Sequence, residues 1–135
     1  MKLYLAGPMR GHPLFNFAAF FSAALHLKEL GHDIINPAER DMAEGLDPSN
    51  PDIAAQGIDI HSMFDFDFRA IQDSAGIVFL PGWEDSKGAC AERVVGHYLG
   101  KLMFDYSPDE REGLKPQRVF EAPEILWRVK PRLHS

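Results

Sequence analysis

Glu92 is the residue whose type and position most suggest chemistry, because it follows a buried-looking strand and stands near the start of a predicted helix. Residues 75–80 are apolar and include β-branched side chains, which is typical of a strand covered on both faces. The next helix is predicted over about residues 88–100, so Glu92 falls in its first turn, where unpaired amide groups and the helix dipole favour an ionised acid. Such a carboxylate, at the edge where α/β sheets bind ligands, can attack an electrophilic carbon. A glutamate that only stabilises its helix is the commoner alternative.

A second acid, Asp67, falls on the apolar row of another predicted helix, over residues 59–73. Met63, Asp67 and Ile71 are four residues apart and therefore share one face. The apolar residues beside this row are Ile60, Phe64 and Phe68. A carboxylate that faces the core costs free energy unless it is paired, hydrogen-bonded or protonated. Asp67 is therefore either a functional acid or a structural one that caps a neighbouring loop, and both interpretations stay open.

Donors suited to a phosphate group stand in two loops. Gly7 permits close backbone approach after the first strand, and Arg10 offers a forked donor, although this loop has neither the GxGxxG nor the Walker pattern. Ser86 and Asp85 are natural caps for the helix that carries Glu92, and Ser86 can equally donate to an anion at the helix N-terminus. Trp83 can stack on a planar ligand or simply shield the sheet edge. For Arg10, an exposed side chain without a partner is the alternative.

The histidines and the single cysteine predict neither a metal nor a cofactor. None of the six histidines has metal-ligand spacing, and Cys90 has no second cysteine with which to form a cluster or a disulfide. Cys90 and His97 lie seven positions apart on one predicted helix, roughly 10 Å along its axis. We therefore expect Cys90 to be a small packing residue.

Alternating strands and helices must position these side chains. The predicted strands cover residues 2–6, 33–35, 75–80 and 103–106, and the predicted helices cover residues 16–30, 59–73, 88–100 and 124–129. Residues 38–57 are predicted to form a long excursion with one short helical turn, and residues 107–117 a polar loop. This alternation predicts an α/β fold with a parallel sheet and right-handed crossovers. The 135 residues, 45% of them hydrophobic, suffice for one core, so residues 1–135 are expected to form a single domain.

Composition excludes several classes of partner. Twenty acidic residues against fourteen basic ones give a net charge of −6, which argues against a broad nucleic-acid surface. The first residues lack the pattern of a signal peptide, and no apolar run is long enough to span a membrane. We therefore expect a soluble, cytoplasmic protein whose ligand is a small molecule.

Four segments, taken together and in this order, resemble the nucleoside 2-deoxyribosyltransferase superfamily, and in particular a small branch often encoded by phages and prophages. They are residues 4–11 (YLAGPMRG), 36–39 (NPAE), 67–73 (DFRAIQD) and 80–92 (LPGWEDSKGACAE). The resemblance covers most of the chain up to Gly100. It implies a flavodoxin-like three-layer sandwich whose parallel sheet has four or five strands.

The resemblance also implies an activity, which is cleavage of the N-glycosidic bond of a 2-deoxynucleoside or its 5′-monophosphate. In that superfamily the glutamate matching Glu92 attacks the anomeric carbon, and water or a second base resolves the glycosyl-enzyme. Asp67 matches the acid that protonates or holds the departing base, and Tyr4 matches a tyrosine that borders the sugar and the nucleophile. Family members are homodimers or higher homo-oligomers, so a homo-oligomer is expected here. These roles agree with the interpretation of the residues given above, in which different environments give the carboxyl groups of Glu92 and Asp67 different pKa values.

Two departures favour a nucleoside 5′-monophosphate as the substrate. Ser86 stands where transferases of free nucleosides carry an acid, and residues 7–11 have the Gly-x-x-Arg-Gly loop of the monophosphate hydrolases. Separately, Ala89 replaces a hydroxyl residue common in transferases, which argues against transferase activity. The expected phosphate cradle is Arg10, Ser86 and the loop amides. The full set of expected substrate-binding residues is Gly7, Met9, Arg10, Gly11, Asn36, Trp83, Ser86 and Gly88. Base exchange between nucleosides, and a non-catalytic module that binds or sequesters a nucleotide, remain alternatives, and neither the base nor the type of sugar is fixed.

Overall fold

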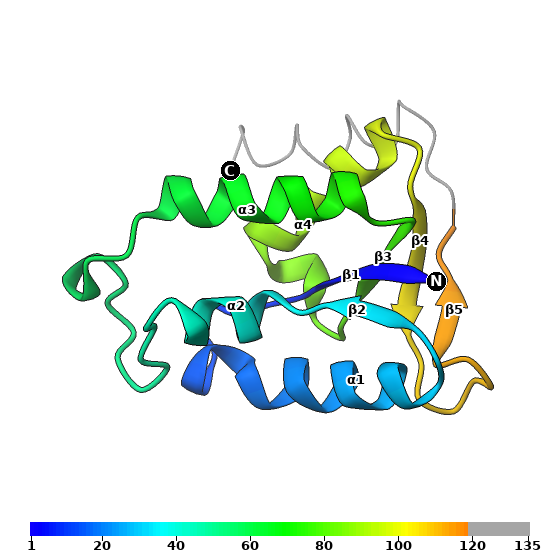
Figure 1. The fold of residues 1–135 in the computed structure, drawn as a ribbon, viewed down its shortest axis with the longest axis horizontal. Coiled ribbons are helices and arrows are strands. Elements are labelled where there is room, and N and C mark those ends of the chain that lie inside the picture. Colours follow the sequence, from blue (N-terminus) through cyan, green and yellow to red (C-terminus); the bar gives the residue numbers. More distant parts are fainter. Residues whose placement is uncertain (119–135) are drawn as a thin grey trace.

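The computed structural model of the chain describes residues 1–118, in which helices pack against a mixed sheet (Figure 1). Its strands are β1 (Lys2–Ala6), β2 (Asp33–Ile35), β3 (Gly76–Phe79), β4 (Leu102–Tyr106) and β5 (Leu114–Pro116). Its α-helices are α1 (Phe17–Glu29), α2 (Pro37–Ala43), α3 (Ile60–Asp73) and α4 (Lys87–Tyr98). Short 3₁₀ turns cover Pro13–Asn16, Ala54–Gln56 and Trp83–Asp85.

The sheet has the strand order β2-β1-β3-β4-β5, and the first four strands are parallel. The predicted flavodoxin-like fold is therefore confirmed, with one addition, because β5 runs antiparallel to β4 at the edge. The strand order reverses between β1 and β3, which is the position where open α/β sheets bind ligands. The register places Ala6, Phe79 and Asp105 side by side across the three central strands.

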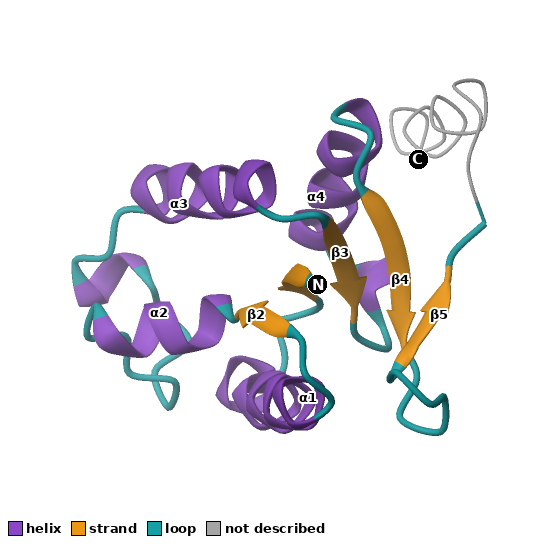
Figure 2. Ribbon diagram, turned by 45° about the vertical axis from the view of Figure 1, so that its right-hand side comes forward, coloured by secondary structure: helices purple, strands orange, loops and turns teal. Residues whose placement is uncertain are grey.

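Two hydrophobic cores lie on opposite faces of the sheet because alternate strand residues point to opposite sides. On one face, Leu3, Leu5 and Val78 pack with the buried side of α1. On the other face, Tyr4 and Ile77 pack with the buried residues of α3. Figures 1 and 2 show this layering, with α1 on one side of the sheet and α3 and α4 on the other. Tyr4 thus faces the layer that carries both predicted acids.

The predicted elements are confirmed to within a few residues, with exceptions in the two polar stretches. The excursion over residues 38–57 holds more helix than one turn, since α2 begins at Pro37 and is capped by the side chain of Asn36. The prediction of a loop over residues 107–117 is wrong, because Leu114–Pro116 pairs with β4. This edge strand is too short to show an alternating pattern and is held by the hairpin. The predicted helix over residues 124–129 lies outside the described residues.

Helix α3 presents its predicted row inward, since Ile71 is fully buried and Asp67 is partly buried. The inclusion of Ile60 and Phe64 in the face toward the sheet is wrong, because these side chains are 46% and 50% exposed. They lie about a quarter turn from the row, and Phe64 instead contacts the Phe68 ring, with the centroids 3.9 Å apart. Within residues 1–118, no helix has both the length and the apolar character that a bilayer crossing requires.

Candidate active site

Tyr4 and Glu92 meet where the strand order reverses. Tyr4 is the central residue of β1 and is 1% exposed, and its hydroxyl donates a hydrogen bond of 2.5 Å to Glu92 Oε2. The two residues are 88 positions apart in the sequence, so only the fold brings them together. A buried phenol normally has a hydrogen-bond partner, and here that partner is an acid. Burial, followed by the charge of Glu92, raises the pKa of Tyr4 well above its usual value, so Tyr4 stays a donor.

Glu92 lies in the second turn of its helix, whereas the sequence predicted the first turn. Helix α4 begins at Lys87 with Ser86 as its N-cap, which places Glu92 in the second turn, beyond the unpaired amides. The expectation that the helix terminus keeps Glu92 ionised is therefore wrong. Burial and the nearby charge of Asp67 raise the pKa of Glu92 to about 8, while the hydrogen bond from Tyr4 opposes this shift.

Asp67 approaches the same tyrosine from α3. Its carboxyl group is partly buried, and its side chain interacts with the Tyr4 hydroxyl. Burial raises the pKa of Asp67 to about 7, and the charge of Asp41 adds to the shift, whereas Tyr4 and Arg40 oppose it. The three groups predicted to be catalytic, on β1, α3 and α4, are thus brought together. Because the carboxyl groups of Asp67 and Glu92 interact, they lose their protons in two steps, and the apparent pKa values of these steps belong to the pair.

These raised pKa values predict how stability depends on pH. From the ordinary carboxyl values of 3.8 and 4.5 up to about 7 and about 8, the folded protein holds protons that the unfolded chain has lost. The free energy of unfolding therefore decreases as pH rises through this window. We expect Asp67→Asn and Glu92→Gln each to raise the melting temperature by a few degrees at about pH 8.5 and by less at about pH 5.

Thermal unfolding followed by circular dichroism at both pH values measures this effect. Asp65→Asn is the control, since the Asp65 side chain is 67% exposed and should change little at either pH. A melting temperature that falls at both pH values in the two site variants would contradict the burial argument.

The residues predicted to hold a phosphate are arranged around two loops. Arg10 is exposed, and within residues 1–118 its side chain makes no hydrogen bond or ion pair. The Ser86 hydroxyl accepts a hydrogen bond of 3.2 Å from the amide of Ala89, which leaves its own proton able to donate. Gly11 has a φ of +82°, a conformation that favours glycine, and Gly88 is exposed in the first turn of α4.

Gly7 has a packing role that the sequence argument missed. A Cβ atom at Gly7 would lie 2.8 Å from Leu80 Cβ, so the glycine allows the end of β1 to pack against the end of β3. We expect Gly7→Ala to destabilise the fold by about 1–3 kcal/mol through overpacking. Gly88→Ala is the matched control, because its nearest neighbour would be 3.9 Å away. Denaturant unfolding of both variants measures the difference, and equal stability would contradict it.

Two further predicted binding residues, Asn36 and Met9, are partly or wholly buried. Asn36 is 5% exposed at the end of β2, where its Oδ1 accepts a hydrogen bond of 3.0 Å from the amide of Ala38. Its Nδ2 has no partner among the described residues, and so one buried donor is available. Met9 packs against the core on the α1 face of the sheet.

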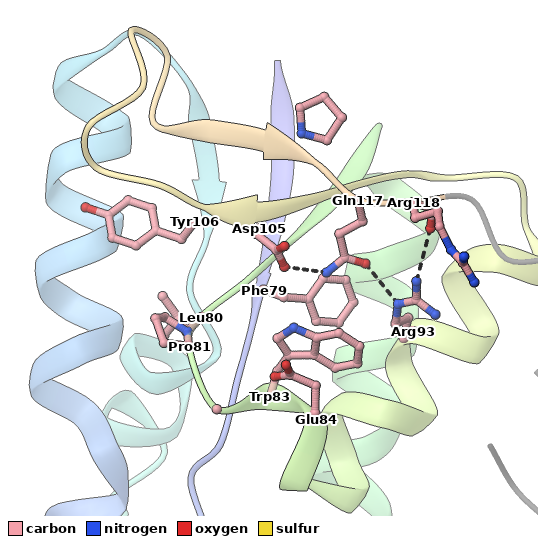
Figure 3. Close-up of a pocket in the computed structure, with 12 residues that line it drawn as sticks. Phe79, Leu80, Pro81, Trp83, Glu84, Arg93, Asp105, Tyr106, Gln117 and Arg118 are labelled. Carbon is pink, nitrogen blue, oxygen red and sulfur yellow. Dashed lines mark hydrogen bonds between the residues drawn. The ribbon is translucent and has the colours of Figure 1, made fainter.

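Trp83 lines a cavity that the two acids do not line. Its ring packs against Phe79 at 5.0 Å and beneath the guanidinium of Arg93 at 5.2 Å. Together these residues line a cavity of about 460 Å³ at the ends of β3 and β4, which Tyr4, Asp67 and Glu92 do not line (Figure 3). The internal contacts of Trp83 match the shielding role more closely than stacking on a ligand near Glu92.

A hydrogen-bonded chain closes one wall of this cavity. Arg93 Nε donates to Gln117 Oε1 at 2.9 Å, and Gln117 Nε2 donates to Asp105 Oδ1 at 2.7 Å (Figure 3). The chain connects α4 to the end of β5 beside β4. It was not predicted because the edge strand itself was not.

Helix α2 contributes two residues that sequence reasoning missed. Asp41 is 5% exposed, and its Oδ1 lies 3.6 Å from Arg40 Nη1. Both residues line a second cavity, of about 230 Å³, between α2 and the start of α3. The weak periodicity of this polar stretch gave no signal that an acid would be buried there.

The remaining titratable side chains suggest no metal centre. Within residues 1–118, no group of three or more His, Cys, Asp or Glu side chains is arranged to hold a metal ion. The Cys90 sulfur lies 3.4 Å from the carbonyl oxygen of Glu84 and 3.7 Å from that of Trp83, in agreement with a packing role.

The fold and the site together define a flavodoxin-like α/β domain with a tyrosine and two acids at the reversal of its strand order. Within this class, the chain belongs to the DUF4406 family, described as a domain of unknown function, whose family profile matches residues 1–105. The matched region contains Tyr4, Asp67 and Glu92 but not β5. No curated protein matches the chain.

Proposed function

We propose that this protein cleaves the N-glycosidic bond of a 2-deoxynucleoside 5′-monophosphate and releases the free base. The observation that carries the proposal is the hydrogen bond from Tyr4 to Glu92 with Asp67 beside it, because this reaction needs a nucleophile, an acid and a group that orients them. The motif resemblance to the nucleoside 2-deoxyribosyltransferase superfamily supports the same activity and is part of the proposal.

In the first step the Glu92 carboxylate attacks the anomeric carbon and forms a glycosyl ester. The bond between that carbon and the base nitrogen breaks, its electron pair stays with the base, and the Asp67 carboxyl group delivers a proton to the base. In the second step water attacks the anomeric carbon, the ester bond breaks to restore Glu92, and Asp67 accepts the proton of the water. Retaining glycosidases use the same division of labour between two carboxyl groups.

The pair of acids needs one proton at the start of this cycle. At neutral pH, raised pKa values hold a proton in the pair, whereas two ordinary carboxyl groups would both be ionised. The hydrogen bond from Tyr4 stabilises the ionised form of Glu92, and the charge of Asp41 favours the protonated form of Asp67. In the free protein the higher pKa of Glu92 leaves the shared proton mainly on that carboxyl group. The proposed reaction requires the proton to be on Asp67, and the negative charge on Glu92, when substrate is bound.

The phosphate-binding part of the proposal depends on donors of two segments, the loop after β1 and the start of α4. Arg10 supplies a fork of donors, Ser86 supplies a hydroxyl proton, and the first amides of a twelve-residue helix attract an anion. An acid in place of Ser86 would repel the phosphate. These features favour a monophosphate over a free nucleoside.

Incubation with a panel of deoxynucleoside and ribonucleoside monophosphates, with the free nucleosides as controls, tests the proposal. We expect free base to appear from at least one monophosphate, in water alone, and more slowly from the matching nucleoside. Product formed only after an acceptor base is added would instead support base exchange. Binding without base release from any nucleotide would support a nucleotide-binding module. The homo-oligomer that the resemblance implies is a separate proposal, and light scattering measures it.

A further inference from the structure

Asp41 is a buried acid to which the mechanism above gives no role. It lies on α2, where it is 5% exposed. Among the described residues, the charges that act on its pKa are those of Arg40, next to it, and of Glu44, at the C-cap of α2. Burial raises the pKa of Asp41 to about 6, and Arg40 opposes the shift. At neutral pH Asp41 is therefore mainly ionised, and a buried ionised acid costs free energy that needs a reason.

The geometry of α2 and α3 places Asp41 close to Asp67. The Arg40 guanidinium lies 4.4 Å from the ring centroid of Phe66, which immediately precedes Asp67. Arg40 and Asp41 line the cavity of about 230 Å³ together with Met63. Met63 is one helical turn before Asp67 on the inward row of α3. The pair on α2 thus packs against the part of α3 that presents Asp67.

Charged and titratable groups reach Asp67 from three elements. Tyr4 on β1 and Glu92 on α4 interact with it from the sheet and from the next helix. Asp41 and Arg40 act from α2 with opposite signs, and the effect of Asp41 is the larger. The Asp41 side chain is buried and the Asp67 side chain is partly buried, so negative charges on both are disfavoured.

We propose that Asp41, held in place by Arg40, is a positioning residue whose charge keeps Asp67 protonated, so that Asp67 can deliver its proton to the leaving base. The inference rests on the proposed function for its purpose, but the coupling between the two acids is a property of the folded chain alone. Arg40 keeps Asp41 ionised, and the ionised Asp41 disfavours ionisation of Asp67. This coupling between Asp41 and Asp67 is present before a nucleotide binds.

Titration of ¹³C-labelled aspartate side chains by NMR tests the coupling without any substrate. The Asp67 resonance is assigned by its loss in Asp67→Asn. In Asp41→Asn we expect the pKa of Asp67 to fall by about one unit, equivalent to a roughly tenfold change in its protonation equilibrium. Asp65→Asn is the matched control, since Asp65 lies two positions from Asp67 but is 67% exposed, and it should leave Asp67 unchanged.

A second substitution covers the case in which Asp41→Asn fails to fold. Asp41→Ser also removes the charge and leaves a smaller polar side chain, so it should lower the pKa of Asp67 by a similar amount. An unchanged pKa of Asp67 in whichever of the two variants folds would overturn the inference.

The pH profile of kcat/KM for base release gives the functional readout, and Asp41→Asn should move its basic limb to lower pH. A shifted Asp67 in a protein that releases no base would overturn the proposed function but not the coupling. Base release with an unshifted Asp67 and an unmoved basic limb would overturn the coupling but not the function.

Discussion

Replacement of Glu92 by glutamine is expected to reduce base release by at least about 10³-fold, since an amide cannot form the glycosyl ester and comparable losses follow removal of other enzymic nucleophiles. The amide oxygen can still accept the hydrogen bond that Tyr4 donates to Glu92 in the present structure. The variant should therefore fold and bind nucleotide with affinity close to that of the unaltered protein. Chromatographic assay of free base, together with calorimetric nucleotide binding, separates these two effects.

Glu84→Gln is the matched control for this prediction. Glu84 lies in the 3₁₀ turn before α4, is exposed, and lines the cavity of Trp83 rather than the site of Glu92. Its replacement should leave base release nearly unchanged. Retention of more than about a tenth of the activity in Glu92→Gln would exclude Glu92 as the nucleophile, because such a small loss fits a positioning role.

Replacement of Asp67 by asparagine is expected to lower kcat about 10²–10⁴-fold, the usual contribution of a positioned general acid. Asparagine can still donate a hydrogen bond to the base but cannot transfer a proton. The loss should therefore depend on how strongly the leaving base needs that proton. Assays of kcat with a series of bases of different basicity measure this dependence.

A nucleotide of N7-methylated guanine gives the sharpest comparison, because its base already carries a positive charge and departs without protonation. On this substrate Asp67→Asn should lose much less activity than on the unmethylated nucleotide. An equal loss on both substrates would show that Asp67 acts in some other way, for example by holding the sugar.

The sequence predicted the parts of this site that depend on periodicity. Asp67 could be placed on the inward row of its helix because Met63 and Ile71 flank it at helical spacing, and the structure has this row inward. The parallel sheet followed from the alternating elements, and the flavodoxin-like sandwich followed from the resemblance. The meeting of Tyr4 and Glu92 depends on packing across 88 positions, which only the resemblance suggested.

The errors have physical causes that local patterns do not encode. Counted from the Ser86 cap, Glu92 is the sixth residue of α4 and lies in its second turn, and burial is the main influence on its pKa. Asp41 was missed because a seven-residue helix is too short for a clear apolar row. The glycine at position 7 was interpreted as room for a ligand, whereas its contact is with Leu80.

The central claim is that Glu92 forms a covalent bond with the sugar, and mass spectrometry of the protein after incubation with a slowly turned-over nucleotide tests it most directly. A 2-fluoro substituent on the sugar slows both steps, because it disfavours the positive charge that develops at the anomeric carbon. We expect the peptide that contains Glu92 to gain the mass of the sugar phosphate, and Glu92→Gln to gain none. Base release without any adduct on Glu92, or an adduct on another residue, would contradict the account.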